Sequence, residues 1–313
     1  MLQPHAVPPP TVSASDVSSR GDTGGVTTCG PALPGPDEWS RWRIDVVGEL
    51  HEGKQSRVFE ARRDGIDLAV KLTDAGLADR ALLETRSEAV ERLGTTHGDV
   101  VAPIAIDGAS VQRIGDWLMT ATPFVDGDPL DATRPTDAER LGRALARLHD
   151  ALGRLPVFDL PPIRALDRSG REVDRSGWQL LHGDFSTKNI VVSEGRLRIF
   201  DFDDCGYGPV EYDVANSLYM ELFDATVTNR PERYETFRPA FVAGYRSEWG
   251  GIGDDDLDHM IQIRVGALAA WLRDLPSAPI GIRTASPAWL ATLAEFVESY
   301  QIRVGDASGG PCA

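Results

Sequence analysis

Two short segments near the middle of the chain constrain its fold more than any other feature of the sequence. The first reads His-Gly-Asp-Phe-Ser-Thr-Lys-Asn over residues 182–189, and the second reads Ile-Phe-Asp-Phe-Asp over residues 199–203. The residues between them are short apolar runs around a turn, which predicts a β-hairpin. A turn between short strands would bring Asp184, Asn189 and Asp201 to one edge of that hairpin.

These residue types at this spacing suit the transfer of a phosphoryl group to a hydroxyl. Asp184 would accept the hydroxyl proton, while Asn189 and Asp201 would hold Mg²⁺ through hard oxygen ligands. A His-Gly-Asp tripeptide alone carries little information. The Asp-x4-Asn spacing, the apolar strand and the second acidic segment together are much more specific.

A lysine upstream completes this pattern. Ala69-Val70-Lys71 lies in a predicted strand over residues 66–73. A strand lysine can pair with the α- and β-phosphates of ATP when a helix supplies a glutamate that orients it. We expect Glu88 to be that partner, with Glu84, one turn earlier, as the alternative. Without the downstream segments, an exposed lysine on an edge strand would be the simpler interpretation.

The hydrophobic pattern divides the chain into a β-rich part and a helical part. Period-two runs predict strands near residues 43–50, 56–62, 66–73, 100–106 and 117–124, with one amphipathic helix over 78–93. After Asp126-Gly127 the pattern is mainly helical. A capping box at Thr136–Glu139 predicts a helix start, and Leu141, Leu145, Leu148 and Leu152 share one face. Further helices are expected at 211–224, 231–248, 254–274 and 286–302.

On these motifs the chain resembles the aminoglycoside phosphotransferase and choline kinase-like family of small-molecule kinases, over roughly residues 43–303. The resemblance implies an α+β, two-lobed, protein-kinase-like fold. We therefore expect a small β-rich N-lobe over residues 41–125 and a larger, mostly helical C-lobe over residues 126–303. The cofactors implied are ATP, or GTP, and Mg²⁺.

The resemblance also implies a role for each matching residue. Asp184 would be the catalytic base and Asn189 and Asp201 the metal ligands, while Lys71 and Glu88 would position the phosphates. Backbone groups near Pro123 and Val125 would face the adenine edge, and Val58 and Ala69 would pack on its ring. Further phosphate contacts are expected from Gly53, Ser56 and Lys188.

The sequence departs from the protein-kinase pattern in two places. The phosphate-covering loop over residues 51–58 keeps only the middle glycine, Gly53, of the G-x-G-x-x-G pattern. Asp203 stands where protein kinases have glycine, and it could approach the metal, contact a cationic substrate or cap a turn. His-Gly-Asp in place of His-Arg-Asp, and the short connection after Asp201, indicate a small acceptor and not a protein.

The basic residues are distributed unevenly. Only three of the 32 are lysines, at positions 54, 71 and 188, and all three fall within the predicted phosphotransfer segments. The other 29 are arginines, which is typical of a GC-rich genome. An ammonium is compact and flexible where a guanidinium is planar, so Lys54 and Lys188 become candidates for phosphate contact. Plain exposure of either side chain is the alternative.

Charge and cysteine content exclude several classes of protein. A formal net charge of −16 argues against nucleic acid or an anionic membrane as the main partner and is compatible with a cationic ligand. Three widely separated cysteines exclude a disulfide framework and indicate a reducing, cytoplasmic location. The sequence indicates nothing about oligomeric state.

The two ends of the chain have a different composition. Seven of the 21 prolines precede residue 37, mixed with Ser, Thr and Gly, which predicts a disordered tail over residues 1–40. Residues 304–313 are expected to be frayed. An acidic run over residues 254–258 is expected mainly at a helix N-terminus, where carboxylates complement the helix dipole.

The function that the sequence predicts is an ATP- and Mg²⁺-dependent O-phosphotransferase acting on a small, cationic acceptor. Inactivation of an antibiotic of the aminoglycoside or basic-peptide type is the first hypothesis for its role. The alternative is a metabolic kinase for choline, homoserine, a sugar or an amino sugar; a nucleotide-binding pseudokinase and a protein kinase are further rivals. Candidate residues for binding a cationic acceptor are Asp203, Asp204, Glu221 and Asp224.

Overall fold

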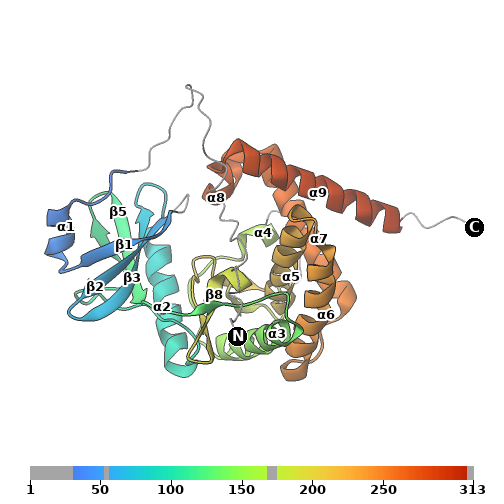
Figure 1. The fold of residues 1–313 in the computed structure, drawn as a ribbon, viewed down its shortest axis with the longest axis horizontal. Helices are drawn as coiled ribbons and strands as arrows, with labels where there is room; N and C mark the ends of the chain where they lie inside the picture. The colour runs from blue at the N-terminus through green and yellow to red at the C-terminus, as the bar shows by residue number, and fades with distance from the viewer. Residues whose placement is uncertain (1–30, 53–55, 168–174, 309–313) are drawn as a thin grey trace, which may run out of the picture. The chain divides into compact units, whose positions relative to one another are not determined.

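The computed structural model describes residues 31–52, 56–167 and 175–308. The elements in the first part of the chain are α1 (Pro36–Arg41), β1 (Asp45–Glu52), β2 (Ser56–Arg63), β3 (Ile66–Asp74), α2 (Arg80–Thr96), β4 (Gln112–Ile114) and β5 (Trp117–Pro123). Their strands form one antiparallel sheet in the order β1-β2-β3-β5-β4. Figure 1 shows this sheet in blue to green, with α1 and α2 beside it.

The two faces of this sheet differ because side chains alternate along each strand. On one face Phe59, Ala61, Leu68, Val70 and Leu72 are at most 6% exposed and form the core of the N-lobe. The other face is half-buried. There Val58 lies opposite Lys71 across the β2–β3 pair, and Ala69 is two residues from Lys71 on the same strand.

The strand predicted near residues 100–106 is wrong. Val100 and Ile106 make only isolated bridges, to Ile199 and Ala109, and the fifth strand of the sheet is β4 instead. Pro103 lies in the middle of the predicted run and has no N–H to contribute to a ladder, which explains why no regular strand forms there.

The predicted boundary of the N-terminal tail, at residue 40, is also wrong. Residues Pro36–Arg41 form α1, which begins after Gly35 with a hydrogen bond from the Gly35 N–H to Glu38. The ring of Trp39 packs edge-on against Phe59, with 5.8 Å between ring centroids. The compact unit accordingly begins at Leu33. The prediction of disorder for residues 1–30 falls outside the described residues.

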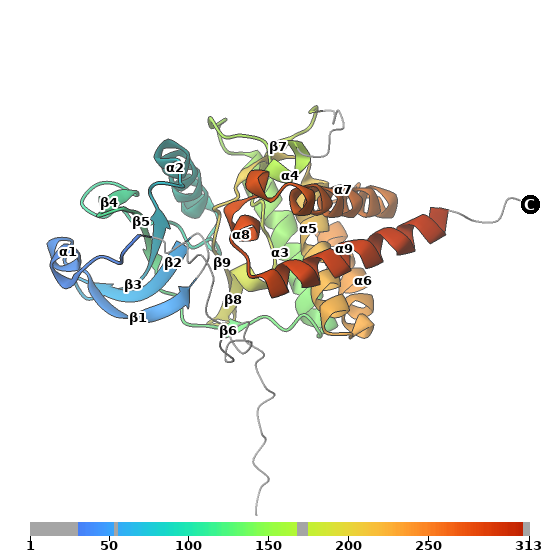
Figure 2. The same ribbon diagram turned by 90° about the horizontal axis from the view of Figure 1, so that it is seen from above.

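The second part of the chain is mostly helical. Its strands and short helices are β6 (Asp128–Pro129), α4 (Arg164–Asp167), β7 (Gln179–Leu181), η1 (Thr187–Asn189), β8 (Ile190–Ser193), β9 (Arg196–Ile199), β10 (Gly206–Gly208), η2 (Leu275–Ser277) and α8 (Ile280–Arg283). Its long helices are α3 (Pro135–Gly153), α5 (Val210–Val227), α6 (Pro231–Glu248), α7 (Asp254–Arg273) and α9 (Pro287–Ser308). The strands form a β6-β8-β9 sheet, which contains the predicted hairpin, and a β10-β7 pair. Figure 2 shows β8 beside the long helices.

Two separate hydrophobic clusters support the two lobes. The smaller lies in the five-stranded sheet, and the larger joins the long helices to the β7–β9 region. Ala89, Val90 and Leu93 of α2 belong to the larger cluster, so this helix packs on the C-lobe although the sequence places it among the N-lobe strands. The predicted α+β fold with a β-rich and a helical lobe is confirmed.

Helices α3 and α6 cross at unusually short distance. A Cβ on Gly142 would lie 2.0 Å from the Phe241 carbonyl oxygen, and a Cβ on Gly244 would lie 2.0 Å from the Glu139 carbonyl oxygen. The four leucines predicted on one face of α3 are all buried. However, α3 starts at Pro135 with Arg134 as N-cap, so the predicted capping box at Thr136 does not form.

The predicted starts of the last two long helices are confirmed. The acidic run opens α7 at Asp254, and the Ser286 hydroxyl caps α9 by accepting the Trp289 N–H at 3.2 Å. Helix α9 continues to Ser308, so the prediction of fraying is wrong for residues 304–308, and residues 309–313 lie outside the described residues. Among the described residues, no helix combines the length and apolar character needed to cross a membrane.

Candidate active site

The loop after β7 requires glycine at its second position. Gly183 has a φ of +87°, which residues with a side chain rarely adopt. A Cβ there would also lie 2.1 Å from the backbone carbonyl oxygen of Asp204. The sequence His-Gly-Asp, in place of His-Arg-Asp, therefore follows from the close approach of the segment around residue 204.

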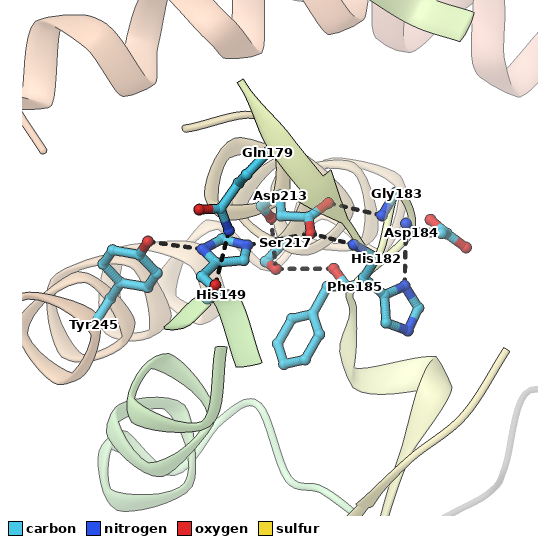
Figure 3. Close-up of polar contacts among 9 residues, drawn as sticks. All are labelled: His149, Gln179, His182, Gly183, Asp184, Phe185, Asp213, Ser217 and Tyr245. Carbon is cyan, nitrogen blue, oxygen red and sulfur yellow. Dashed lines mark hydrogen bonds and ion pairs between the residues drawn. The ribbon is translucent and has the colours of Figure 1, made fainter. Parts of the chain in front are cut away.

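A buried carboxylate braces this loop through its backbone. The Asp213 carboxylate accepts the N–H of His182 at 2.8 Å and the N–H of Gly183 at 2.9 Å (Figure 3). His149 Nε2 lies 3.2 Å from the same carboxylate, and His149 Nδ1 lies 2.8 Å from the Tyr245 hydroxyl. Because a carboxylate only accepts, Nε2 carries the hydrogen and Nδ1 accepts from Tyr245. Helices α3, α5 and α6 thus hold the loop together.

His182 supports the loop and is held neutral. Its Nε2 donates to the Phe200 carbonyl at 3.1 Å, and its Nδ1 accepts the backbone N–H of Asp184 at 3.3 Å. The imidazole lies 4.3 Å from the Phe202 ring, centroid to centroid. Burial lowers the pKa of His182. Both ring nitrogens are therefore engaged, which leaves the proton-accepting role to the neighbouring aspartate.

The carboxylate of Asp184 is held at both oxygens by side-chain amides. Asn189 Nδ2 donates to Oδ2 at 3.1 Å and to the Asp184 backbone carbonyl at 2.9 Å. Asn216 Nδ2 donates to Oδ1 at 3.2 Å. Burial raises the pKa of Asp184, although the charge of Arg264 and the amide bonds oppose this. A carboxylate with a raised pKa and a fixed orientation is well suited to accept a proton.

The oxygen donors beside Asp184 fit a magnesium ion. Within the described residues, both side-chain hydrogen bonds of Asn189 use Nδ2, which leaves its Oδ1 as an oxygen donor. Asp201 lies at the end of the hairpin and bonds Lys71 through Oδ1, with a second carboxylate oxygen beside it. Mg²⁺ typically takes one or two protein oxygens and completes its shell with phosphates and water. No cluster of three His, Cys, Asp or Glu suited to a metal occurs among the described residues.

The predicted pair of Lys71 and Glu88 does not form. Lys71 Nζ lies 2.8 Å from Asp201 Oδ1 and 2.7 Å from Asp203 Oδ2. Burial lowers the pKa of Lys71, but the two carboxylates outweigh this and raise it, so the side chain is an ammonium. Glu88 instead pairs with Arg92 at 2.8 Å, and its side chain is 54% exposed.

The orientation of α2 about its own axis explains why Lys71 and Glu88 do not pair. Glu84, the alternative partner, likewise pairs along the helix, with Arg80 at 2.7 Å. Residues four apart on a helix are neighbours on its surface, so each glutamate meets an arginine of its own helix. The buried face of α2 consists of Ser87, Ala89, Val90 and Leu93.

The residues predicted to line the nucleotide site share a face of the sheet. Val58, Ala69 and Lys71 lie together on the half-buried face, and Lys71 reaches the hairpin of the C-lobe from there. Ser56 is the first residue of β2 and lies two residues before Val58 on the same strand. Gly53 lies outside the described residues.

The predicted hinge follows β5 directly. Pro123 ends the strand, and the Phe124 N–H donates to the Asp67 carbonyl at 2.9 Å. Within the described residues, the backbone of Val125 makes no hydrogen bond to another backbone group. Val125 is the position at which the sequence predicts contact with the adenine edge.

Two of the acidic residues proposed for the acceptor serve the loop around η1. Glu221 is 2% exposed, accepts the Thr187 hydroxyl at 2.9 Å and lies 3.6 Å from Arg233. A buried carboxylate with these contacts does not face an acceptor, which corrects that prediction. Asp224 lies 3.4 Å from Lys188 Nζ, so this pair ties η1 to the end of α5.

The other two candidates lie just after the hairpin. Asp203 is paired with Lys71, as described above. Partial desolvation and the charge of Asp184 raise the pKa of Asp204 to about 6, although the guanidinium of Arg86 opposes this. Arg86 also donates from Nε to the Cys205 carbonyl at 3.0 Å, which connects α2 to this segment.

Sequence reasoning missed Asn216, Arg264 and Arg86. Asn216 lies one helical turn after Asp213, a spacing that places both on the same face of α5 and could have indicated it. Arg264 is on α7, and its Nε donates to Asn216 Oδ1 at 3.2 Å. No local pattern connects a residue on α7 to the loop after β7, because only the packing of the helices brings them together.

The chain is similar to known proteins over the segment that forms this site. The family model described as the phosphotransferase enzyme family matches residues 163–254, the segment that contains the loop, the hairpin and α5. A probable bifunctional tRNA threonylcarbamoyladenosine biosynthesis protein of Methanoculleus marisnigri is 24% identical over 252 residues, covering 80% of this chain. The match covers only 39% of that relative's length.

Solved structures share the fold. An amicoumacin kinase (hAmiN), in complex with AMP-PNP, Ca²⁺ and Ami, superposes with a TM-score of 0.64 at 18% identity, covering 83% of this chain and 88% of that one. A microcompartment-associated aminopropanol kinase superposes with a TM-score of 0.60 at 19% identity, covering 82% of this chain and 89% of that one. The solved structures confirm the fold class predicted from the sequence, and the family model matches residues 163–254 to the phosphotransferase enzyme family, in agreement with the resemblance stated from the sequence.

Proposed function

We propose that this chain, whose catalytic segment matches the phosphotransferase enzyme family, transfers the γ-phosphoryl group of ATP to a hydroxyl of a small, cationic molecule. One observation carries the proposal. The carboxylate of Asp184 is held between two amides, and one of these, Asn189, keeps an oxygen donor and accepts the N–H of Phe200, the residue before Asp201, at its backbone carbonyl. A proton acceptor and a pair of hard oxygen donors thus share one loop and hairpin.

The residues divide the chemistry among them. Asp184 takes the hydroxyl proton as the acceptor oxygen forms its bond to the γ-phosphorus, and the bond from that phosphorus to the β–γ bridging oxygen breaks, leaving ADP. Lys71 meets the α- and β-phosphates from the sheet. Asn189 and Asp201 would hold Mg²⁺, which neutralises phosphate charge when bound. Most of the rate then comes from orientation and charge neutralisation.

Lys71 must change partners for this reaction. Its ammonium is held by Asp201 and Asp203, and a nucleotide would compete with both carboxylates. Lys188 is paired with Asp224 and 57% exposed, and it would contact the γ-phosphate. Val58 and Ala69 would cover the adenine ring, and Pro123 and Val125 would meet its edge. Ser56, with Gly53, would contribute to the phosphate-covering loop.

We propose inactivation of a basic antibiotic as the role of this reaction, in the cytoplasm where ATP is supplied. The amicoumacin kinase among the similar folds supports testing this role first. The acidic chain, with its net charge of −16, is compatible with a cationic acceptor.

A second candidate is a metabolic kinase for a small amino alcohol. One observation favours it: Glu221, one of the four carboxylates proposed for the acceptor, is held inside the fold by Thr187 and Arg233. The loss of this carboxylate leaves fewer acidic groups for a polycation and suits an acceptor with a single positive charge. The aminopropanol kinase among the similar folds is named for such an acceptor.

A ³²P-transfer screen tests both candidates. Purified protein with Mg²⁺ and [γ-³²P]ATP is incubated with kanamycin, spectinomycin, choline, 1-amino-2-propanol, homoserine and glucosamine, with Asp184→Asn as the negative control and GTP in a parallel arm. Labelling of an antibiotic, together with protection of cells that express the gene, supports inactivation. Labelling of an amino alcohol without protection supports the metabolic role. If no compound is labelled, or if the Asp184→Asn protein labels equally well, the proposal fails.

A further inference from the structure

The orientation of the Asp184 carboxylate depends on two residues to which no role has been given so far. We propose that Asn216 and Arg264 are positioning residues, and that Arg264 acts on Asp184 through the side-chain amide of Asn216. The inference rests on the proposed function, because it is Asp184 that faces the acceptor hydroxyl.

The first step is the direction of the Asn216 amide. A carboxamide has a donor end and an acceptor end of nearly the same shape, and its neighbours decide which end faces where. Asn216 is 1% exposed, so water does not make this choice. Arg264 Nε lies 3.2 Å from Asn216 Oδ1, and a guanidinium has no acceptor. The oxygen of Asn216 must therefore face Arg264, and its N–H must face Asp184.

The second step is the anchoring of Arg264. Its guanidinium carbon lies 5.0 Å from the ring centre of Tyr219 and 5.9 Å from that of Trp271. Two rings and Asn216 thus hold it between α5 and α7. Within the described residues its Nη1 is buried without a hydrogen-bond partner. A buried donor without a partner costs stability, so packing alone does not account for an arginine here.

The third step is the effect on Asp184. Asn216 binds Oδ1 and Asn189 binds Oδ2, so both carboxylate oxygens are held and the plane of the group cannot rotate freely. The lone pairs left over therefore point in a fixed direction. The positive charge of Arg264 also opposes the effect of burial on the pKa of Asp184. Without Arg264 the oxygen of Asn216 loses its donor, so the side chain could rotate and lose its hydrogen bond to the carboxylate.

Kinetics with single and double variants test this chain of contacts. The variants are Asn216→Ala, Arg264→Met and the double variant, measured with whichever compound of the transfer panel the wild-type protein labels fastest. We expect kcat to fall about 10- to 100-fold in each, with KM for both substrates changed little. A small misorientation of a reacting group lowers the rate of the chemical step by a factor in this range. The double variant should be no slower than Asn216→Ala alone. Arg264→Lys, which keeps a charged donor, should recover part of the loss.

Arg273→Met is the matched control, since Arg273 is an exposed arginine at the end of the same helix. We expect wild-type kcat from it. Losses that multiply in the double variant would show that Arg264 acts by another route and would overturn the inference, as would a loss confined to KM.

Crystal structures of wild type and Arg264→Met supply a measurement that does not need an acceptor. The inference expects the Asn216–Asp184 hydrogen bond to be lost in the variant and the carboxylate of Asp184 to rotate. An unchanged Asp184 side chain, still bonded to Asn216, would refute it. If the panel yields no labelled compound, the proposed function fails while these structures still decide whether Arg264 orients Asp184.

Discussion

At the scale of single residues, hydrogen-bond partners fix the roles of the polar side chains in the site. His182 keeps its hydrogen on Nε2 because Phe200 accepts it, and this leaves Nδ1 to receive the backbone of Asp184. Asp213 uses both oxygens on the same loop. The side chain of Asp184 has hydrogen-bond donors on two sides. It is the side chain of this loop to which we assign a change of protonation during the reaction.

Replacing Asp184 by asparagine tests its role as the base. We expect kcat to fall about 10²- to 10⁴-fold, the usual contribution of a general base. Thermal stability should be unchanged or higher, because burial raises the pKa of Asp184 and so disfavours its charged form. Steady-state kinetics and thermal unfolding measure the two effects. Asp116→Asn, at a side chain that is 79% exposed, is the control. Retention of more than a tenth of kcat in Asp184→Asn would contradict the assignment.

The carboxyl of Asp204 predicts a pH dependence of stability. In the folded protein its pKa is raised to about 6, compared with an ordinary value of 3.8. The folded state therefore binds more protons than the unfolded state between these values, and this group's contribution to the free energy of unfolding falls as pH rises through that range. Asp204→Asn should lack this fall.

The measurement is the melting temperature of both proteins from pH 4 to pH 7. We expect the variant to gain stability relative to wild type as the pH rises, and Asp116→Asn to follow wild type throughout. Parallel profiles for Asp204→Asn and wild type would show that Asp204 titrates normally.

At the scale of helices, the crossing of α3 and α6 is the tightest feature that the site depends on. It brings Tyr245 of α6 within 2.8 Å of His149 of α3, and His149 in turn contacts Asp213. Gly142 and Gly244 permit this approach, because a side chain on either residue would overlap the backbone of the other helix. The bracing of the loop after β7 therefore begins at two glycines far from it in sequence.

Alanine at Gly142 or Gly244 should force these helices apart. We expect each variant to lose about 1–3 kcal/mol of unfolding free energy, the usual effect of overpacking, or to misfold. Urea denaturation measures this. Gly266→Ala on α7 is the matched control, because a Cβ there meets nothing within 4 Å, and alanine in a helix interior is favoured over glycine. Equal stability of Gly142→Ala and Gly266→Ala would contradict the close crossing.

At the scale of the described chain, contacts around residues 201–205 are among those that join the sheet and the helical part. Lys71 reaches Asp201 and Asp203 from the sheet, and Arg86 of α2 reaches the Cys205 carbonyl. Cys205 is fully buried at this junction, and its thiol therefore reports on whether the parts stay together.

The thiol of Cys205 should be protected in the folded protein. Burial raises its pKa to about 12, so almost no thiolate exists at pH 8. We expect iodoacetamide to leave Cys205 unmodified under native conditions and to modify it after unfolding in urea. Peptide mass spectrometry separates it from Cys29 and Cys312. Rapid native labelling of Cys205 would show that the junction opens readily.

Much of this molecule could be predicted from local sequence. The strands β2 and β3, the helices α5, α6 and α7 and the hairpin at the site follow from short-range periodicity and turn residues. The triad of Asp184, Asn189 and Asp201 was recognisable because all three belong to one loop and hairpin. Among the missed elements, α1 and β4 are short, and their packing on the sheet decides whether they form.

The chemical character of the site was thus already present in the sequence, since spacing within one turn or hairpin fixes which side chains meet. The partners that reach it from other elements were not. Lys71 meets Asp201 and Asp203 in place of Glu88, Asp213 meets His149, and Asn216 meets Arg264. These contacts depend on how helices rotate and cross when apolar faces are buried, and hydrophobic burial has no direction of its own. Only the packed structure selects among the pairings that the sequence allows.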